Sequence, residues 1–285
     1  LQAYHHTALR VCRDIDLMVQ HKDLDQATDI LLQNGYYIHH EHSGAEHNPL
    51  FERFSHHLSL VNSTNGLKLE LHWRLLPTVV MDVTHFWRNA NSTALTGIET
   101  LQFASEDLIL LLLIHGSKHL WAELIWAADI DKLLRQVPEI DWDYLLALSQ
   151  TWGVGRFVRV GILFCHTLLE SPVPELVLTK CRRDQVAIHL CDHSQRSLFE
   201  PQSRQNPLSE YHADFQMRDT WKGKMRYVGY LLTNWKPSSR DVAFLPLPKT
   251  LRFLYPVVRL IRVPIQYMGG LIKSRKKVEQ IYHDR

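Results

Sequence analysis

A short segment of alternating side chains, residues 67–73, constrains the fold of this chain more than any other feature. Apolar and polar residues take turns along it, which is typical of a β-strand with one buried face and one polar face. Lys68, Glu70 and His72 therefore share the polar face. An Asn-Gly pair just before the segment is a tight-hairpin signal, so we expect residues 54–62 to form a preceding strand.

The residues before this hairpin predict further strands around one helix. Residues 11–19 have the pattern of a strand, with Ile15 directed into the core. Residues 22–34 carry apolar side chains at helical spacing, and Gly35 stands where a helix-terminating glycine is expected. Residues 36–42 are another strand candidate. The first eighty residues therefore predict a small α/β core.

From about residue 105 the pattern becomes helical. The expected helices are residues 105–119, 121–135, 141–152 and 156–169. The predicted fold class is α+β, with a mixed-sheet core followed by a mostly helical C-terminal domain. The predicted division is an α/β core in 1–100, a helical domain in 101–200, and a loop with a basic helical tail in 201–285.

Composition narrows the class of protein. The chain has 285 residues, 45% of them hydrophobic, which is enough to bury a core of domain size. A net charge of only +2 supplies no global field that would attract nucleic acid. The four cysteines form no CxxC pair, which argues against structural zinc and indicates a reducing compartment. The longest apolar run, 108–114, is too short to span a bilayer, so we expect a cytoplasmic protein.

Asp14 and Asp16 form the motif that points to chemistry. Two residues apart on a strand, their carboxylates leave the same face, where they would repel each other. A divalent cation relieves this repulsion, and Mg²⁺ prefers carboxylate, phosphate and water oxygens. Glu70 adds a third ligand if its strand is a neighbour, and such a triad has room for two ions that activate a hydroxyl and bind a triphosphate. The alternative is common, since many Asp-x-Asp pairs at strand ends bind no metal.

Six short motifs follow one another in an order that resembles a known family. They are Arg10, Asp-Ile-Asp-Leu at 14–17, Gly-Tyr at 35–36, Glu-Leu-His-Trp at 70–73, His-Gly-Ser-Lys-His at 115–119 and Trp-Ala-Ala-Asp-Ile at 126–130. Together they resemble the uncharacterised nucleotidyltransferases of the DNA polymerase beta-like superfamily, which are found mainly in bacteria. The resemblance covers most of the chain and includes the tail near residues 246–267.

The resemblance implies a nucleotidyltransferase core that moves a nucleoside monophosphate from a nucleoside triphosphate to an acceptor and releases pyrophosphate. Asp14 and Asp16 are expected to bind both metal ions, and Glu70 to complete the attacking site. Mg²⁺ is the expected ion, with Mn²⁺ as the alternative, and ATP is the first choice of triphosphate. The acceptor is not identified and is a small molecule, a peptide or a protein, with nucleic acid less favoured. The family carries a glycine-containing phosphate-binding turn upstream of Leu1, so we expect the sequence to lack its N-terminal segment.

A helix with basic side chains is the second candidate element of the site. His115, Lys118 and His119 lie on one side of it by their spacing, and a lysine there suits an anionic ligand better than zinc. Phosphate or substrate contact is one interpretation, and a polar contact between helices is the other. The remaining residues expected to bind nucleotide or substrate, or to orient groups that do, are Arg10, His72 and Asp129.

Three alternatives stay open from the sequence. One is a catalytically degenerate protein of the same fold that binds a nucleotide or a partner. Another is a histidine-based metal hydrolase, because histidines are dense between residues 39 and 72. We expect most of those histidines on the surface, since consecutive strand residues such as His56 and His57 point to opposite faces.

The third alternative concerns the tail 249–285, which has nine Lys or Arg against two acids. We expect it to pack on the body, with peripheral membrane contact as the alternative.

Overall fold

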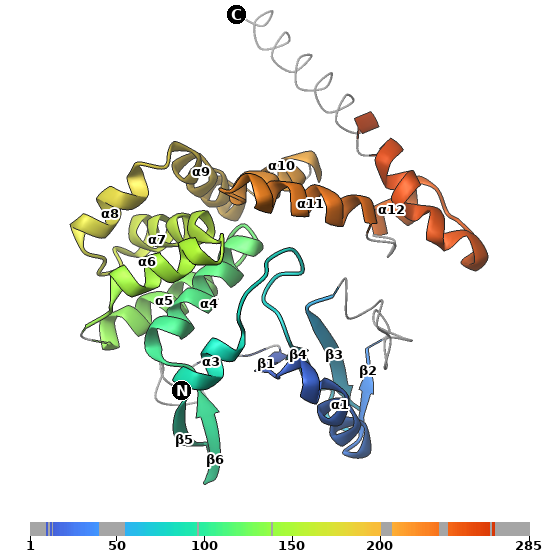
Figure 1. Cartoon of the computed structure of the whole chain (residues 1–285), viewed down its shortest axis with the longest axis horizontal. Helices are drawn as coiled ribbons and strands as arrows, with labels where there is room; N and C mark the ends of the chain where they lie inside the picture. Colours follow the sequence, from blue (N-terminus) through green and yellow to red (C-terminus); the bar gives the residue numbers. More distant parts are fainter. Residues whose placement is uncertain are drawn as a thin grey trace, which may run out of the picture. The chain divides into compact units, whose positions relative to one another are not determined.

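The computed structural model describes residues 10, 12, 14–39, 55–95, 97–137, 139–200, 207–233, 239–262 and 264–265. The chain divides into two compact units, residues 1–194 and residues 195–285. Figure 1 shows the α/β part of the first unit and its helices, followed along the chain by the helices of the second unit. The observed mixture of a four-stranded sheet and many helices confirms the predicted α+β class. The predicted boundary at residue 100 stays a prediction.

A mixed four-stranded sheet opens the first unit, in the order β1-β4-β3-β2. Its strands are β1 (Asp14–Met18), β2 (Tyr36–Ile38), β3 (His57–Asn62) and β4 (Lys68–His72). β1 runs parallel to β4, whereas β3 is antiparallel to both β4 and β2. The sheet therefore brings β1 next to the alternating strand β4, although about fifty residues separate the two in sequence.

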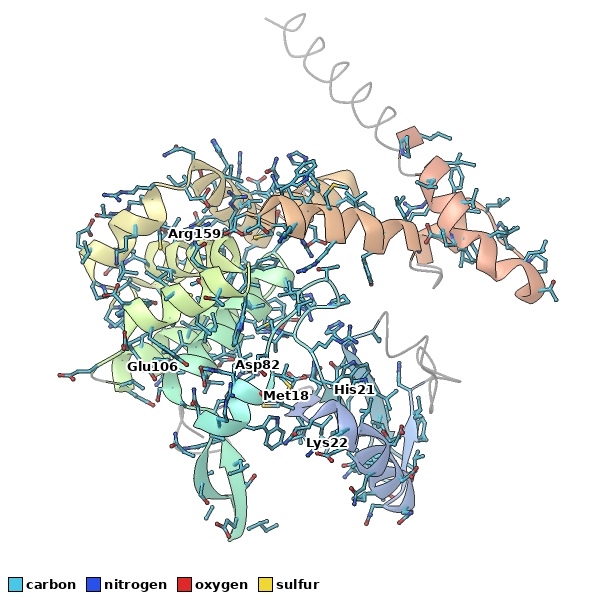
Figure 2. All side chains as sticks on the ribbon, in the orientation of Figure 1. Met18, His21, Lys22, Asp82, Glu106 and Arg159 are labelled. Atoms are coloured by element: carbon cyan, nitrogen blue, oxygen red, sulfur yellow. The ribbon has the colours of Figure 1, made fainter. Side chains whose placement is uncertain are left out.

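One helix covers the apolar face of this sheet. The 3-10 turn η2 (His21–Asp23) leads into α1 (Leu24–Gln33), which ends before Gly35 in the left-handed conformation, at φ +79°. This confirms the predicted helix and its terminating glycine. Figure 2 labels Met18 at the end of β1 and His21 at the start of this turn. The core under the helix consists of Leu24, Leu58, Leu60, Leu69, Leu71 and Trp73.

The structure corrects the predicted burial of β1. Ile15 and Leu17 pair with Leu69 and Leu71 of β4, so they do lie on the apolar face. However, their side chains are 40% and 42% exposed, whereas both leucines are buried. The reason is that β1 is an edge strand, and α1 packs over the middle of the sheet rather than over this edge. The alternation of side chains correctly identified the face on which Ile15 and Leu17 lie. It did not show that α1 leaves this part of the face uncovered.

A second hairpin was not predicted. After the short helix α3 (Thr84–Asn89), strands β5 (Asn91–Leu95) and β6 (Ile98–Gln102) pair in an antiparallel ribbon. Their side chains are mostly exposed, so the segment lacks the regular apolar face that marks a strand in sequence. Gly97, in the turn, has φ +83°, a conformation that favours glycine. The sequence analysis did not use this glycine as a turn signal.

The helices of the first unit follow the ribbon. They are α4 (Ser105–Lys118), α5 (Leu124–Gln136), α6 (Trp142–Thr151), α7 (Gly155–Leu169), α8 (Glu175–Arg182) and α9 (Gln185–Phe199), which runs across the boundary between the units. The first four confirm the predicted helices within a few residues. The apolar run 108–114 lies inside α4 and is mostly buried. Among the described residues, no helix is long and apolar enough to cross a membrane.

The second unit is helical in its described part. It contains α10 (Pro207–Met217), α11 (Trp221–Thr233), α12 (Ser239–Phe244), the 3-10 segment η5 (Lys249–Leu254) and a helical stretch at 255–262. Asp241 is fully buried and forms ion pairs with Arg259 at 2.7 Å and Arg262 at 2.9 Å. Two of the nine basic residues of the tail are therefore buried in ion pairs. Of the predicted loop and tail in 201–285, residues 201–206 and 266–285 are among those that lie outside the described residues.

Candidate functional site

The polar face of the sheet gathers the acidic residues singled out in the sequence. The register pairs Asp16 with Glu70 across β1 and β4, and Glu70 with Ser59 across β4 and β3. Because paired residues point to the same side, Asp14, Asp16 and Glu70 all project from one face. Asp14 pairs with Lys68 one step along the same face. The sheet thus brings the three predicted carboxylates together.

His72 joins two of these carboxylates. Its Nε2 lies 2.9 Å from Oδ1 of Asp16 and 3.4 Å from Oε2 of Glu70. Ligand atoms of Asp16, Glu70 and His72 all lie within 4.8 Å of one another. The Asp16 side chain is 54% exposed, whereas that of Glu70 is only 14% exposed. A ligand can therefore reach Asp16 from solvent, whereas the protein encloses most of Glu70.

Two neighbours hold Glu70 in place. Lys68, two residues earlier on the same strand, places Nζ 2.6 Å from Oε1 of Glu70. The Ser59 hydroxyl donates a hydrogen bond to the same oxygen at 3.1 Å. Although burial opposes ionisation, the hydrogen bond from His72 and the charges of His57 and Lys68 keep the pKa of Glu70 far below its usual range. Glu70 is thus a fixed, ionised carboxylate.

The two aspartates differ in charge balance. Burial raises the pKa of Asp14, and the charges of Asp16 and Glu70 raise it further. Burial also opposes ionisation of Asp16, but the hydrogen bond and charge of His72 outweigh it and lower the pKa of Asp16. At Asp14, neighbouring positive charges therefore do not fully neutralise the negative charge of the acidic group. This is the electrostatic condition that a bound cation relieves.

The C-terminal half of α4 supplies the basic side of the site. Nζ of Lys118 lies 3.0 Å from Nε2 of His56, which directly precedes β3. The charge of Lys118 lowers the pKa of His72. This interaction links α4 to the polar face of the sheet. The contact of Lys118 with His56 therefore brings the predicted basic helix to the end of the sheet that carries the predicted carboxylates.

Trp126, on α5, contacts both histidines of α4. Its ring lies 5.1 Å from the His115 ring and 5.4 Å from the His119 ring, measured between centroids. Burial first, and the charge of Lys118 second, lower the pKa of His115 to about 4 and that of His119 to about 3. Both imidazoles are therefore neutral near pH 7, and Lys118 is the cation of the three.

This arrangement predicts an acid-sensitive fold. A histidine in the unfolded chain has a pKa near 6.5. Between about pH 6.5 and pH 3, His119 is therefore protonated in the unfolded chain but stays neutral in the folded protein. The free energy of unfolding should fall as the pH falls through that window. His119→Gln should therefore flatten the fall of the unfolding temperature between pH 7 and pH 4.5, measured by thermal denaturation.

The comparison with wild type is needed because His72 acts in the opposite direction. Its hydrogen bonds to Asp16 and Glu70 outweigh burial and raise its pKa, so its stabilisation is present at low pH and lost as the pH rises. His189→Gln, at an exposed position of α9, is the matched control. A profile for His119→Gln as steep as that of wild type would contradict the prediction.

Arg10 and Asp129 form an ion pair between the segment before β1 and helix α5. Nη2 of Arg10 lies 2.9 Å from Oδ2 of Asp129, and Nε lies 3.0 Å from Oδ1. This two-point contact fixes the orientation of the guanidinium. The contact joins Arg10 of the predicted α/β core to Asp129 of the predicted helical domain, so it is an ion pair between those two parts of the sequence. A role of Asp129 in orienting His115, Lys118 or His119 stays a prediction.

The structure corrects the prediction that His56 and His57 point to opposite faces and lie on the surface. Nε2 of His56 lies 3.2 Å from Nδ1 of His57, and both residues are half-buried. β3 begins only at His57, so the alternation of strand side chains does not apply to His56. Of the other histidines in the stretch, His39 is half-buried, and residues 40, 42 and 47 lie outside the described part of the chain.

Several residues of the site were missed by sequence reasoning or given no role in it. They are His56, His57, Ser59, Lys68 and Trp126. Lys68 was on the predicted polar face, so its contact with Glu70 followed from the alternation alone. Ser59 and His57 require the register of the hairpin, which the sequence left open.

The donor groups fit a divalent cation. Asp16 and Glu70 are ionised oxygen donors whose ligand atoms lie within 4.8 Å of each other, and Asp14 stands one register step away. Carboxylate oxygens are the ligands that Mg²⁺ prefers, while the His72 nitrogen is a donor that Mn²⁺ also accepts. Burial first, and the charges of Asp16 and Glu70 second, raise the pKa of Asp14, and an ion bound beside it would favour its charged form.

Comparison with known proteins gives one match. The model of a family described as uncharacterised nucleotidyltransferase matches residues 1–170, more than half of the 285-residue chain. No curated protein and no solved structure matches. The matched range contains every residue of the site described above, from Arg10 to Asp129.

Proposed function

The chain belongs to this family of uncharacterised nucleotidyltransferases, and from that membership and the geometry of its site we propose that it transfers a nucleoside monophosphate from a nucleoside triphosphate to an acceptor, with release of pyrophosphate. The observation that carries the proposal is the register of β1 and β4, which sets Asp16 beside Glu70 on the polar face. Two strands far apart in sequence thereby contribute to one acidic group. ATP is the proposed triphosphate, and the acceptor is a small molecule, a peptide or a protein.

In the proposed site Asp14 and Asp16 hold the metal ions and Glu70 completes the attacking side. Mg²⁺ bound by these carboxylates supplies neutralisation of the triphosphate and a lowered pKa for the attacking hydroxyl. The protein contributes position: Ser59 and Lys68 fix the Glu70 carboxylate. Asp16 is half-exposed and faces the incoming ligand.

The basic residues are proposed to bind the phosphates. Lys118 is the cation of α4 that faces the polar side of the sheet, with Nζ on His56. Neutral His115 and His119 can each donate one N–H to a phosphate oxygen. Arg10 is already held by Asp129 and presents a fixed guanidinium beside β1. Together these groups would counter the charge of a triphosphate.

A second function has one observation in its favour. Lys68 lies 2.6 Å from Glu70 and already neutralises part of the acidic group, as expected for a protein that binds a nucleotide without transferring it. That protein would show thermal stabilisation by ATP but release no pyrophosphate. The two functions are therefore separated by turnover.

The test of the proposal is pyrophosphate release with Mg²⁺ and each of the four nucleoside triphosphates, with and without EDTA. Glu70→Gln keeps the size of the side chain and removes its charge, so we expect release to fall roughly 10²-fold, as for loss of one electrostatic contact to a transition state. Glu99→Gln, at an exposed position of β6, should retain wild-type release. Equal release by wild type and Glu70→Gln would remove the catalytic assignment.

A further inference from the structure

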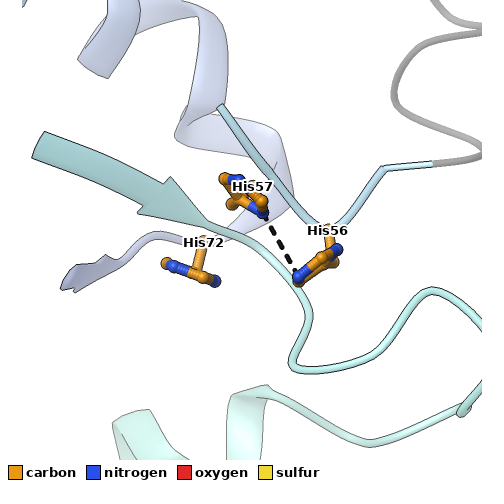
Figure 3. Close-up of side chains that lie close together, drawn as sticks. All are labelled: His56, His57 and His72. Atoms are coloured by element: carbon orange, nitrogen blue, oxygen red, sulfur yellow. Dashed lines mark hydrogen bonds between the residues drawn. The ribbon is translucent and has the colours of Figure 1, made fainter. Parts of the chain in front are cut away.

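Three histidines meet at the end of the sheet beside the carboxylates. His57 and His72 are cross-strand partners on β3 and β4, and His56 directly precedes β3. Their ring centroids lie 5.0 Å apart for His57 and His72, 4.4 Å for His56 and His57, and 5.8 Å for His56 and His72. One nitrogen of each ring lies within 4.8 Å of the others. Figure 3 shows the three rings turned toward a common space.

The spacing of the donor nitrogens suits a tetrahedral ion. Nε2 of His56 and Nδ1 of His57 are 3.2 Å apart. Two imidazole nitrogens bound to one Zn²⁺ at about 2.1 Å each would stand roughly 3.4 Å apart in a tetrahedron. These two rings therefore need little movement to share an ion.

Carboxylates occupy the outer positions that histidine ligands need. Nε2 of His57, the nitrogen turned away from His56, lies 3.7 Å from Oε2 of Glu70. Nε2 of His72 contacts Asp16 at 2.9 Å. A histidine that binds a metal through one nitrogen commonly donates the other N–H to a carboxylate, which fixes the tautomer and the ring orientation. The acidic group of the proposed active site supplies these partners.

Lys118 is the group that competes for this position. Its ammonium donates to Nε2 of His56 at 3.0 Å, and Nδ1 of His57 lies 3.2 Å from the same atom. When His57 carries its N–H on Nε2, toward Glu70, the facing nitrogens of His56 and His57 both carry lone pairs and repel each other. A cation that accepts lone pairs from both rings resolves this conflict, and the flexible lysine side chain can move away.

We propose that His56, His57 and His72 form a binding site for a borderline first-row dication of the Zn²⁺ class, next to the carboxylate site for Mg²⁺, with His72 at the border of the two. Three imidazoles match the donor set of open zinc sites, which keep a fourth position for water or substrate. Mg²⁺ prefers oxygen ligands and is a poor competitor for such a set. The site does not depend on nucleotidyl transfer and binds its ion whether or not the protein is a transferase.

The experiment measures binding of Zn²⁺ and Co²⁺ to the full chain with any affinity tag removed and with 5–10 mM Mg²⁺ present, as a competitor at roughly physiological excess. We expect one Zn²⁺ per chain by elemental analysis and the visible absorption of tetrahedral Co²⁺. His56→Ala and His57→Ala should each weaken Zn²⁺ binding more than about 100-fold, above the loss typical of outer-shell partners. His189→Ala, an exposed histidine of α9, should bind as wild type does.

Two further variants separate this site from its surroundings. Lys118→Met removes the competing ammonium and should tighten Zn²⁺ binding severalfold, an effect that damage to the fold would not produce. Asp14→Asn should leave the Zn²⁺ stoichiometry at one, because Asp14 makes no contact within the trio. Binding that survives in His56→Ala and His57→Ala but is lost in Asp14→Asn would overturn the proposal and assign the ion to the carboxylates. Absence of stoichiometric Zn²⁺ in wild type would also overturn it.

Discussion

Replacing both Asp14 and Asp16 by asparagine is expected to lower nucleotidyl transfer by more than about 10³-fold, beyond the effect of losing a single electrostatic contact. The two residues are two of the three carboxylates on the polar face of the sheet, and asparagine keeps their size while removing both charges. A site that holds Mg²⁺ through these oxygens would lose the ion and the nucleotide bound with it. Pyrophosphate release at saturating Mg²⁺ is the measurement.

The expected stability of this double variant is what makes the result specific. Asp14 is strained electrostatically, since burial and the charges of Asp16 and Glu70 raise its pKa. Neutralising it should therefore raise the unfolding temperature. This gain offsets the ionic part of the His72 contact that asparagine at 16 gives up, while asparagine still accepts a hydrogen bond from His72. Loss of release without loss of stability would identify chemistry rather than folding. Asp25→Asn with Asp29→Asn, on the exposed side of α1, is the matched control, and equal loss in that control would contradict the assignment.

The hairpin shows how far the sequence could predict this site. Alternation placed Glu70 and His72 on one polar face, and the structure agrees, with Leu69 and Leu71 buried on the opposite face. The Asn-Gly pair at 65–66 favours a two-residue turn, but the loop spans residues 63–66, and the amide of Asn62 donates to the carbonyl of Leu67. A two-residue turn would have placed Val61 rather than Ser59 opposite Glu70. The residue that pairs with Glu70, the proposed catalytic carboxylate, thus depended on two residues of loop length.

Long-range pairing was equally hidden. Nothing in the local pattern of residues 11–19 states that β1 lies beside β4, or that the two run parallel. The convergence of Asp16 and Glu70 was a prediction from family resemblance combined with strand geometry. The proximity of α4 was likewise not readable from spacing, because helix packing depends on side-chain fit across the whole unit. Lys118 against His56 is a consequence of that fit.

The histidine pair was misjudged for a local reason. Alternation holds only inside a strand, and the boundary of β3 falls between His56 and His57. Strand ends are the least certain part of any sequence-based assignment. If β3 began one residue earlier, the side chains of His56 and His57 would point to opposite faces. Because it begins at His57, Nε2 of His56 and Nδ1 of His57 lie 3.2 Å apart. The proposed zinc site therefore could not have been found without coordinates.

Gly116→Ala is expected to destabilise the first unit by about 3 kcal/mol, the upper part of the range for overpacking a core. A Cβ at Gly116 would stand 2.5 Å from two ring atoms of Trp121. That ring cannot retreat, because it is fully buried, stacks on Phe164 at 4.7 Å, and donates from Nε1 to the Ser117 hydroxyl. Trp121 itself has φ +53°, a conformation that costs a non-glycine residue roughly 1–2 kcal/mol. Packing of the indole over glycine compensates for that cost.

The sign of this effect separates packing from helix propensity. Gly229→Ala, in α11 with no atom within 4 Å of the added carbon, should be neutral or stabilise by up to about 1 kcal/mol. In thermal denaturation, Gly116→Ala should lower the unfolding temperature by roughly 6–12 °C for a unit of this size. Gly161→Ala should also lower it, because a Cβ there would stand 2.6 Å from Leu113 and 2.9 Å from the same Trp121 ring. A Gly116→Ala protein as stable as wild type would mean that Trp121 does not fix the end of α4. The contacts of Lys118 with His56 and of His119 with Trp126 would then fix these two side chains.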